Sequence, residues 1–138
     1  MADRVRKVNY CHVQVPNRAG QGAKVLGALR AHGVNMLAWT GFPAKAGKAQ
    51  LDIVCDDVSQ VRRIARQEGW RLSPAKRGFL VQGDDRIGAV HRQVEKLSAA
   101  GVNVTAADAI SAGGGRYGMI LWVKPRDYTK AAKALAAR

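Results

Sequence analysis

The sequence predicts an α+β fold in which one small unit is written twice in tandem. The segment Asn17-Arg18-Ala19-Gly20 matches Asp85-Arg86-Ile87-Gly88 at an offset of 68 residues (85 − 17 = 68). The same offset brings Leu29 onto Leu97, and it brings Gly33-Val34-Asn35 onto Gly101-Val102-Asn103. Within each copy, period-2 and period-3.6 hydrophobic patterns alternate in the same order, which is typical of mixed strands and helices.

The first unit is assigned to residues 1–75. Pro16 ends its first strand, and Gly33 ends its first helix, which carries Val25 and Leu29 on one face. Asp57 or Ser59 caps a second helix, whose buried stripe begins at Val58. The predicted segments are strands at Val8–Val15, Met36–Phe42, Ala49–Cys55 and Trp70–Leu72, a helix at Ala23–Ala31, and a helix carrying Val58, Val61, Ile64 and Ala65.

The second unit is assigned to residues 76–138 and repeats the order up to its second helix. The predicted segments are strands at Phe79–Gln82, Val104–Ile110 and Tyr117–Val123, a helix with the stripe Ile87, Val90, Val94 and Leu97, and a helix at Asp127–Ala136. The order β-α-β-β-α-β describes a ferredoxin-like sandwich, so the second copy lacks its last strand. Asp57 matches Asp127 at an offset of 70 (127 − 57 = 70), and we assign the two extra residues to Gly113-Gly114-Gly115.

Composition and charge limit the class of protein. The net charge is +13, from 23 Lys and Arg against 10 Asp and Glu, but the basic residues are scattered, as on a solvated surface. No apolar run approaches the roughly 20 residues that cross a membrane, and the charged N-terminus is unlike a signal peptide. We therefore expect a cytoplasmic protein, with Cys11 and Cys55 reduced and buried in the core.

The two loop-to-helix motifs resemble the ACT domain. The pattern is a strand, then Asn17-Arg18-Ala19-Gly20 or Asp85-Arg86-Ile87-Gly88, then a helix ending before Gly33-Val34-Asn35 or Gly101-Val102-Asn103. The resemblance covers about Val8 to Leu135. It implies an allosteric, regulatory module that binds a free amino acid, or a similar small ligand, at an interface between two such units.

The resemblance and the chemistry of a zwitterion point to the same candidate residues. A helix N-terminus offers N–H groups to a carboxylate, glycine lets a ligand approach the backbone, and short polar side chains accept from an ammonium group. The candidate ligand-binding residues are Asn17, Arg18, Ala19, Gly20, Asn35, Asp85, Arg86, Ile87, Gly88 and Asn103.

Each candidate also has a purely structural interpretation. Asn17 and Asp85 are the right residue types to cap their helices, and the glycines suit a turn. Asn35 and Asn103 follow a helix end, where they satisfy backbone groups.

Catalysis finds little support in the sequence. His12, His32 and His91 are not equivalent between the copies, and no nucleophile or acid stands beside them at a recognisable spacing. We expect no enzyme activity, no cofactor and no metal. The alternative function is single-stranded RNA binding, because RNA-recognition motifs share this topology and Arg116 to Trp122 partly resembles their aromatic strand.

A homo-oligomer, most simply a dimer, is the expected working form. The strand near Phe79 to Gln82 has no fourth strand of its own unit beside it, and an uncovered edge recruits another strand. Leu80, Ile120 and Trp122 also place apolar bulk on a second sheet face, which an interface would cover. The expected partners are therefore a small ligand and a second copy, with no membrane; a regulated enzyme is left unidentified.

Overall fold

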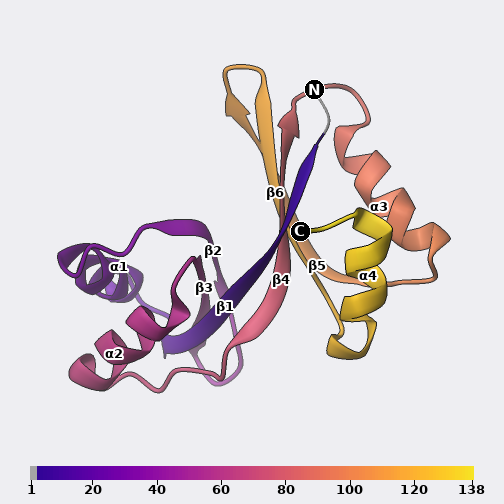
Figure 1. Cartoon of the computed structure of the whole chain (residues 1–138). Coiled ribbons are helices and arrows are strands. Elements are labelled where there is room, and N and C mark those ends of the chain that lie inside the picture. Colours follow the sequence, from indigo (N-terminus) through magenta and orange to yellow (C-terminus); the bar gives the residue numbers. More distant parts are fainter. Residues whose placement is uncertain (1–2) are drawn as a thin grey trace. The chain divides into compact units, whose positions relative to one another are not determined.

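The computed structural model describes residues 3–138, and it confirms an α+β protein of ferredoxin-like units (Figure 1). In chain order the elements are β1 (Arg4–Pro16), α1 (Gln21–Ala31), β2 (Met36–Pro43), β3 (Lys48–Cys55), α2 (Val58–Glu68), β4 (Lys76–Asp84), α3 (Ala89–Ala99), β5 (Val104–Gly113), β6 (Arg116–Val123), a 3-10 turn (Pro125–Asp127) and α4 (Tyr128–Leu135). No helix within 3–138 has both the length and the apolar character needed to cross a membrane.

The chain divides into two compact units, Asn9–Lys76 and a second body of 3–8 with Arg77–Arg138. In the first unit the strand order is β2-β3-β1, and Leu72 adds one antiparallel bridge to Val13. Helices α1 and α2 pack on one face of this sheet over Ile53 and its neighbours. Cys11 and Cys55 are free and buried in this core, and burial raises the pKa of Cys11 to about 12.

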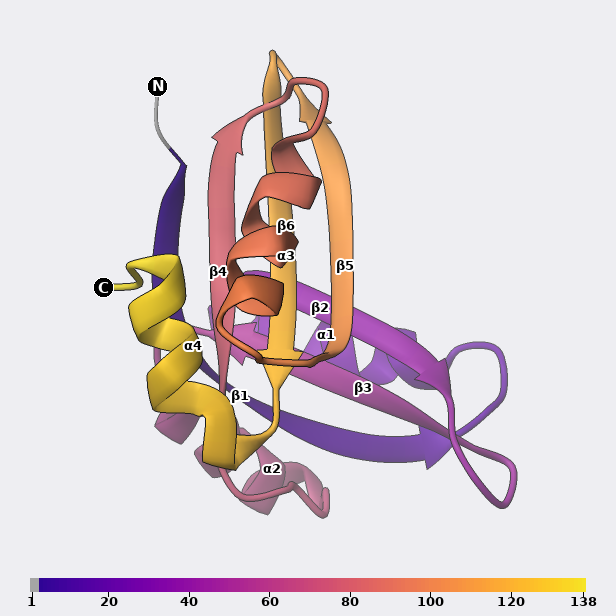
Figure 2. The same ribbon diagram turned by 90° about the vertical axis from the view of Figure 1, so that its right-hand side faces the viewer.

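The second unit closes its sheet with the start of the chain. Its strand order is β1-β4-β6-β5, so the first residues of β1 lie beside β4 (Figure 2). Val5 joins the core of this unit, and the backbone of Arg138 bonds to both Val5 and Lys7. The expectation that the edge at Phe79 to Gln82 is uncovered was wrong, because a segment more than 70 residues earlier fills that place.

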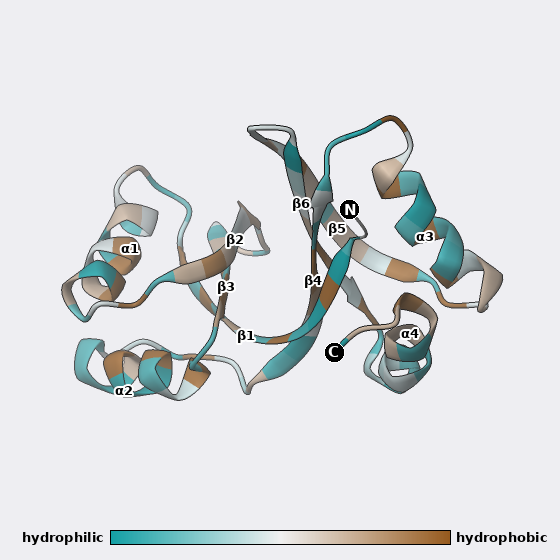
Figure 3. Ribbon diagram, turned by 45° about the horizontal axis from the view of Figure 1, so that its top comes forward, coloured by the Kyte–Doolittle hydropathy of each residue, from teal (hydrophilic) through white to brown (hydrophobic). Residues whose placement is uncertain are grey.

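The apolar residues on the second sheet face are buried without a second copy of the chain. Leu80, Ile120 and Trp122 are each between 5% and 6% exposed within one chain. They belong to neither helix-side core cluster. This sheet face therefore gives no argument for a dimer. Figure 3 shows that hydrophobic residues occur on the elements of both units.

The predicted stripe of the third helix is shifted. Ile87 is fully exposed and Val90 is exposed, whereas α3 buries Ala89, Gln93 and Leu97. The reason is Gly88, whose left-handed φ of 82° turns the chain so that the helix begins only at Ala89. Ile87 therefore stands in the loop, outside the helical period.

The two extra residues of the second copy also lie elsewhere than predicted. Strands β3 and β6 keep the offset of 68 at both ends (116 − 48 and 123 − 55), so the Gly113-Gly114-Gly115 turn contains no insertion. The offset becomes 70 at the next helix (128 − 58). The two extra residues therefore lie between Val123 and Tyr128, in the segment that contains the 3-10 turn Pro125–Asp127. A proline at the start of that turn suits its conformation.

Candidate functional site

In each unit the loop between the first strand and the first helix has the same backbone. Gly20 and Gly88 occupy the position before the helix with φ of 88° and 82°. The N–H of Asn17 donates to the carbonyl of Gly47 at 2.9 Å, and the N–H of Asp85 donates to that of Gly115 at 2.8 Å. Both loops are therefore tied to the hairpin turn of their own unit, which places them at the ends of the strands.

Neither loop uses a side chain to cap its helix. No side-chain cap is found at the start of α1 or α3, so the capping interpretation of Asn17 and Asp85 was wrong. Asp85 instead accepts a hydrogen bond from the hydroxyl of Ser111 at 2.7 Å. This bond joins the loop to β5 and leaves the first N–H groups of α3 without a side-chain acceptor.

A pocket of about 390 Å³ opens at this place in the second unit. It is walled by the loop, the first turn of α3, one stretch of β5 and one residue of β6. The lining residues are Asp85, Arg86, Gly88, Ala89, Val90, His91, Ala109, Ile110, Ser111 and Tyr117. The structure thus brings Asp85, Arg86 and Gly88 together, while Ile87 is not among the lining residues and is fully exposed.

Tyr117 anchors the wall of the pocket to a buried carboxylate. Its hydroxyl donates to Oδ2 of Asp3 at 2.7 Å, and Nε2 of Gln93 donates to the same oxygen at 2.7 Å. Arg92 lies 3.6 Å from that oxygen, and the Asp3 side chain is only 4% exposed. Burial, and then the bond to Asp3, raises the pKa of Tyr117 well above its usual range. Tyr117 therefore remains protonated and holds its ring in place.

No local pattern in the sequence indicates this network, because its partners are too far apart in the chain. Asp3 and Tyr117 are separated by 114 residues, and Asp3 lies in the charged N-terminal segment. Gly83 marks the place in β4 where the network lies, because a side chain at this position would collide with the carboxylate of Asp3. Ser111 was overlooked because its importance depends on the register of β5.

The corresponding place in the first unit is filled by an indole ring. An ideal Cβ on Gly41 would lie 3.3 Å from Cη2 of Trp39, and one on Gly22 would lie 4.0 Å from its Cζ2. At the offset of 68 these two glycines correspond to Ala109 and Val90, which line the open pocket, and Trp39 corresponds to Ala107 (107 − 39 = 68). Arg18, Ala19 and Gly20 are exposed on this loop.

Asn35 and Asn103 stand apart from the loop residues of their own units. Asn35 precedes Met36, which pairs with Cys55, whereas the loop follows Pro16, which pairs with Lys48 at the other end of β3. In the second unit Asn103 precedes Val104, opposite Val123, while Asp84 and Gly113 both pair with Arg116. Both asparagines are exposed, one strand length from the pocket end.

The aromatic residues that would stack on RNA are not presented to solvent. Tyr117 is 4% exposed and Trp122 is 6% exposed. Tyr117 lies in the helix-side core, the side opposite to an exposed sheet platform. Base stacking needs an accessible ring face, so β6 does not provide the expected platform.

Comparisons with known proteins bear on the fold. Neither the protein-family models nor the curated proteins give a match. Among solved structures, a protein from Bacteroides thetaiotaomicron has a TM-score of 0.79 at 16% identity, over 97% of this chain and 88% of that one. The regulatory subunit of aspartate kinase from Thermus flavus has a TM-score of 0.60 at 14% identity, over 98% of this chain and 94% of that one. The fold is ACT-like.

A larger enzyme contains a region of the same fold. Aspartokinase III from E. coli, crystallised with aspartate and ADP, has a TM-score of 0.55 at 15% identity. The match covers 97% of this chain but 32% of that enzyme. The fold of this chain is thus one that occurs in regulatory subunits of aspartate kinase as well as in a whole aspartokinase.

Proposed function

We propose that this protein is a non-catalytic regulatory module of tandem ACT type that binds a free amino acid in the Asp85–Ser111 pocket. The observation that carries the proposal is the open pocket of about 390 Å³ at the loop-to-helix junction of the second unit. Its volume falls within the range of small-molecule sites. The regulatory subunits that share the fold support the same class of function.

The lining of the pocket offers a partner for each part of an amino acid. The N–H groups in the first turn of α3 suit the carboxylate, since a helix N-terminus carries partial positive charge. The carboxylate of Asp85, fixed by Ser111, suits the ammonium group. Val90 and Ile110 offer an apolar wall to the side chain. Small and medium apolar amino acids fit this chemistry best.

The exposed side of the pocket favours a second copy of the chain as its cover. Strand β5 is the last strand in the order of the described sheet, and all its residues after Val104 are exposed. Val90 and Ile110, which share the pocket lining, are large exposed hydrophobic residues at this edge. An unpaired edge with apolar neighbours recruits another strand, and a symmetric pair is the simplest assembly. We therefore propose a homodimer through β5.

Calorimetric titration with each of the standard amino acids tests the ligand proposal. We expect one or a few apolar amino acids to bind with saturation, and Asp85→Ala to weaken that binding about tenfold or more, the usual loss for a charge-assisted hydrogen bond. Asn17→Ala, at the matched position of the first unit, is the control and should change little. Gly88 is not substituted in this experiment, because any residue with a Cβ would strain the backbone at its positive φ.

Two outcomes of that experiment would reject the proposal. The first is that no amino acid binds the folded wild-type protein. The second is that Asp85→Ala and Asn17→Ala have equal effects. Single-stranded RNA is titrated in parallel, and binding of RNA alone, with a steep salt dependence, would support the RNA function instead.

Light scattering with and without the ligand tests the dimer. We expect a mass of twice 14.8 kDa and a decrease towards 14.8 kDa in Ile110→Lys, which puts a charge on the proposed interface. Phe42→Lys, on the edge strand β2 of the first unit at the position that corresponds to Ile110 (110 − 42 = 68), is the matched control and should leave the mass unchanged. A wild-type mass of 14.8 kDa at all ligand concentrations would contradict the β5 dimer.

A further inference from the structure

A second pocket in the same unit shares no lining residue with the amino-acid pocket. It has a volume of about 310 Å³ and lies where β1, β4 and α4 meet. Its lining residues are Lys7, Arg77, Tyr128, Thr129, Ala132, Lys133, Ala136 and Ala137. The proposed function makes no use of this pocket.

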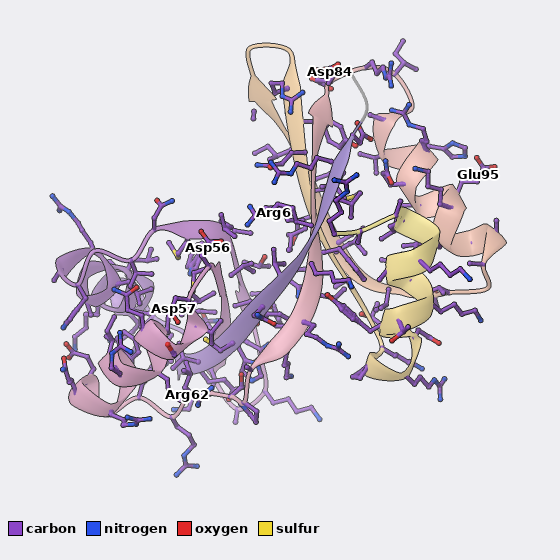
Figure 4. All side chains as sticks on the ribbon, in the orientation of Figure 1. Arg6, Asp56, Asp57, Arg62, Asp84 and Glu95 are labelled. Carbon is purple, nitrogen blue, oxygen red and sulfur yellow. The ribbon has the colours of Figure 1, made fainter. Side chains whose placement is uncertain are left out.

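Three positive charges converge on this pocket from three different elements. Lys7 comes from β1, Arg77 from β4 and Lys133 from α4, and all three residues are exposed. Among the described residues that line the pocket, none is acidic. Like charges repel when no anion lies between them, so their convergence favours a bound anion. Arg62 on α2, labelled in Figure 4, instead donates to the backbone carbonyl of Ser73 at 3.2 Å.

The guanidinium of Arg77 is held in position before any ligand arrives. It stacks on the ring of Tyr128, with 4.0 Å from Cζ to the ring centroid. That ring is buried, its hydroxyl donates to the carbonyl of Gly78 at 3.0 Å, and it packs on Phe79 with centroids 4.5 Å apart. A fixed guanidinium loses little conformational entropy on binding, so it contributes more affinity than a mobile surface side chain does.

We propose that this pocket binds a phosphate-bearing small molecule. Arg77 suits two phosphate oxygens at once, Lys7 and Lys133 supply charge, and the hydroxyl of Thr129 is a further donor. Ala132, Ala136 and Ala137 form an uncharged wall beside the cations, where the remainder of the ligand lies. Free pyrophosphate and a nucleoside triphosphate share the recognised chemistry.

Calorimetry with sodium pyrophosphate and with ATP, at constant ionic strength, tests this proposal. We expect saturable binding of at least one probe, and a loss of about tenfold or more in Arg77→Gln, because a charged donor to phosphate is removed. The control Arg63→Gln removes the same charge from an exposed position on α2 and should change the affinity less than twofold. Circular dichroism establishes that each variant is folded.

The arms of the experiment separate the possible sources of phosphate. Tighter binding of ATP identifies a nucleotide, and equal or tighter binding of pyrophosphate identifies the phosphates alone. If Arg77→Gln does not fold, Lys133→Gln carries the same expectation. Absence of saturable binding, or equal losses in Arg77→Gln and Arg63→Gln, would overturn the proposal and leave general attraction to a basic protein. Amino-acid binding stays intact in Arg77→Gln, so the two proposals fail independently.

Discussion

The two units share a backbone and differ at the place where a ligand would bind. Backbone hydrogen bonds recur at the offset of 68. The N–H of Lys24 donates to the carbonyl of Gly20, and the N–H of Arg92 donates to the carbonyl of Gly88. In the same way, the N–H of Val34 donates to the carbonyl of Leu29, and the N–H of Val102 donates to the carbonyl of Leu97. Both hairpins even carry the same irregularity after their first residue. The backbone has therefore been kept through the duplication, while the side chains around the helix start have diverged.

Four paired positions distinguish the two units between the helix start and the hairpin, where the pocket of about 390 Å³ opens in the second unit. The first unit has a different pocket, of about 580 Å³, which is lined by residues of β1, α1 and the segment at the end of α2. Each pair differs by 68 residues, and three of the four first-unit residues are either bulkier than their counterparts or lack the hydroxyl that makes the second-unit contact. The pairs are Asn17 and Asp85, Trp39 and Ala107, Pro43 and Ser111, and Ala49 and Tyr117. Proline has no hydroxyl to donate, and the Trp39 ring fills space that Ala107 leaves empty. The comparison predicts one amino-acid site per chain, in the second unit.

The largest effect is expected for Ala107→Trp, which places the first unit's tryptophan at the corresponding position of the second unit. Placed as Trp39 is, the new indole would reach the positions of Val90 and Ala109 and occupy the pocket. We expect amino-acid affinity to fall more than about a hundredfold, since overlap of ring and ligand costs more than one lost polar contact. Calorimetry measures the loss, with Ala107→Ser as the control that preserves the space. Unchanged affinity in the folded Ala107→Trp protein would refute the pocket assignment.

The second prediction concerns the Asp3 network, which the first unit lacks because Ala49 replaces the tyrosine. Tyr117→Phe leaves a buried carboxylate with one donor fewer, and this should lower the free energy of unfolding by about 1–3 kcal/mol. Urea unfolding measures the change. In the double variant with Asp3→Asn the loss should be smaller than the sum of the two single losses, because the two residues interact directly. Additive losses would show that the bond contributes nothing.

These positions also show what the sequence could predict. The element order, the core stripe of α2 and the turns at Gly20 and Gly88 follow from hydrophobic period and from the repeat. The partner of β4 and the Asp3–Tyr117 bond depend on contacts between residues far apart in the chain. Ile87 was misplaced for a different reason, since one left-handed glycine shifted the start of α3 and rotated its buried face.

The third prediction concerns Trp39→Ala, which removes the indole ring that fills the corresponding place in the first unit. The indole is 40% exposed, so its removal should cost about 1–2 kcal/mol of unfolding free energy, less than a fully buried aromatic residue would. We expect no second amino-acid site to appear in calorimetry, because Pro43 cannot make the bond that Ser111 makes with Asp85. Binding of two ligands per chain would show that ring volume alone distinguishes the units.

The smallest expected effect concerns His12, which corresponds to Leu80 in the second unit (80 − 12 = 68). Burial, and then the charge of Lys76, lowers the pKa of His12 below its ordinary value of 6.5. The unfolded chain therefore binds a proton at a pH where the folded chain does not, so folding stability from this residue is present above pH 6.5 and decreases as the pH falls below it. His12→Leu, which copies the second unit, removes this titration. We expect the difference in unfolding free energy between pH 7.5 and pH 5 to be slightly smaller in the variant than in the wild type, as measured by urea unfolding, with the exposed His32→Leu as the control. An equal pH dependence of the unfolding free energy in wild type and His12→Leu would show that the titration of His12 does not distinguish the two units.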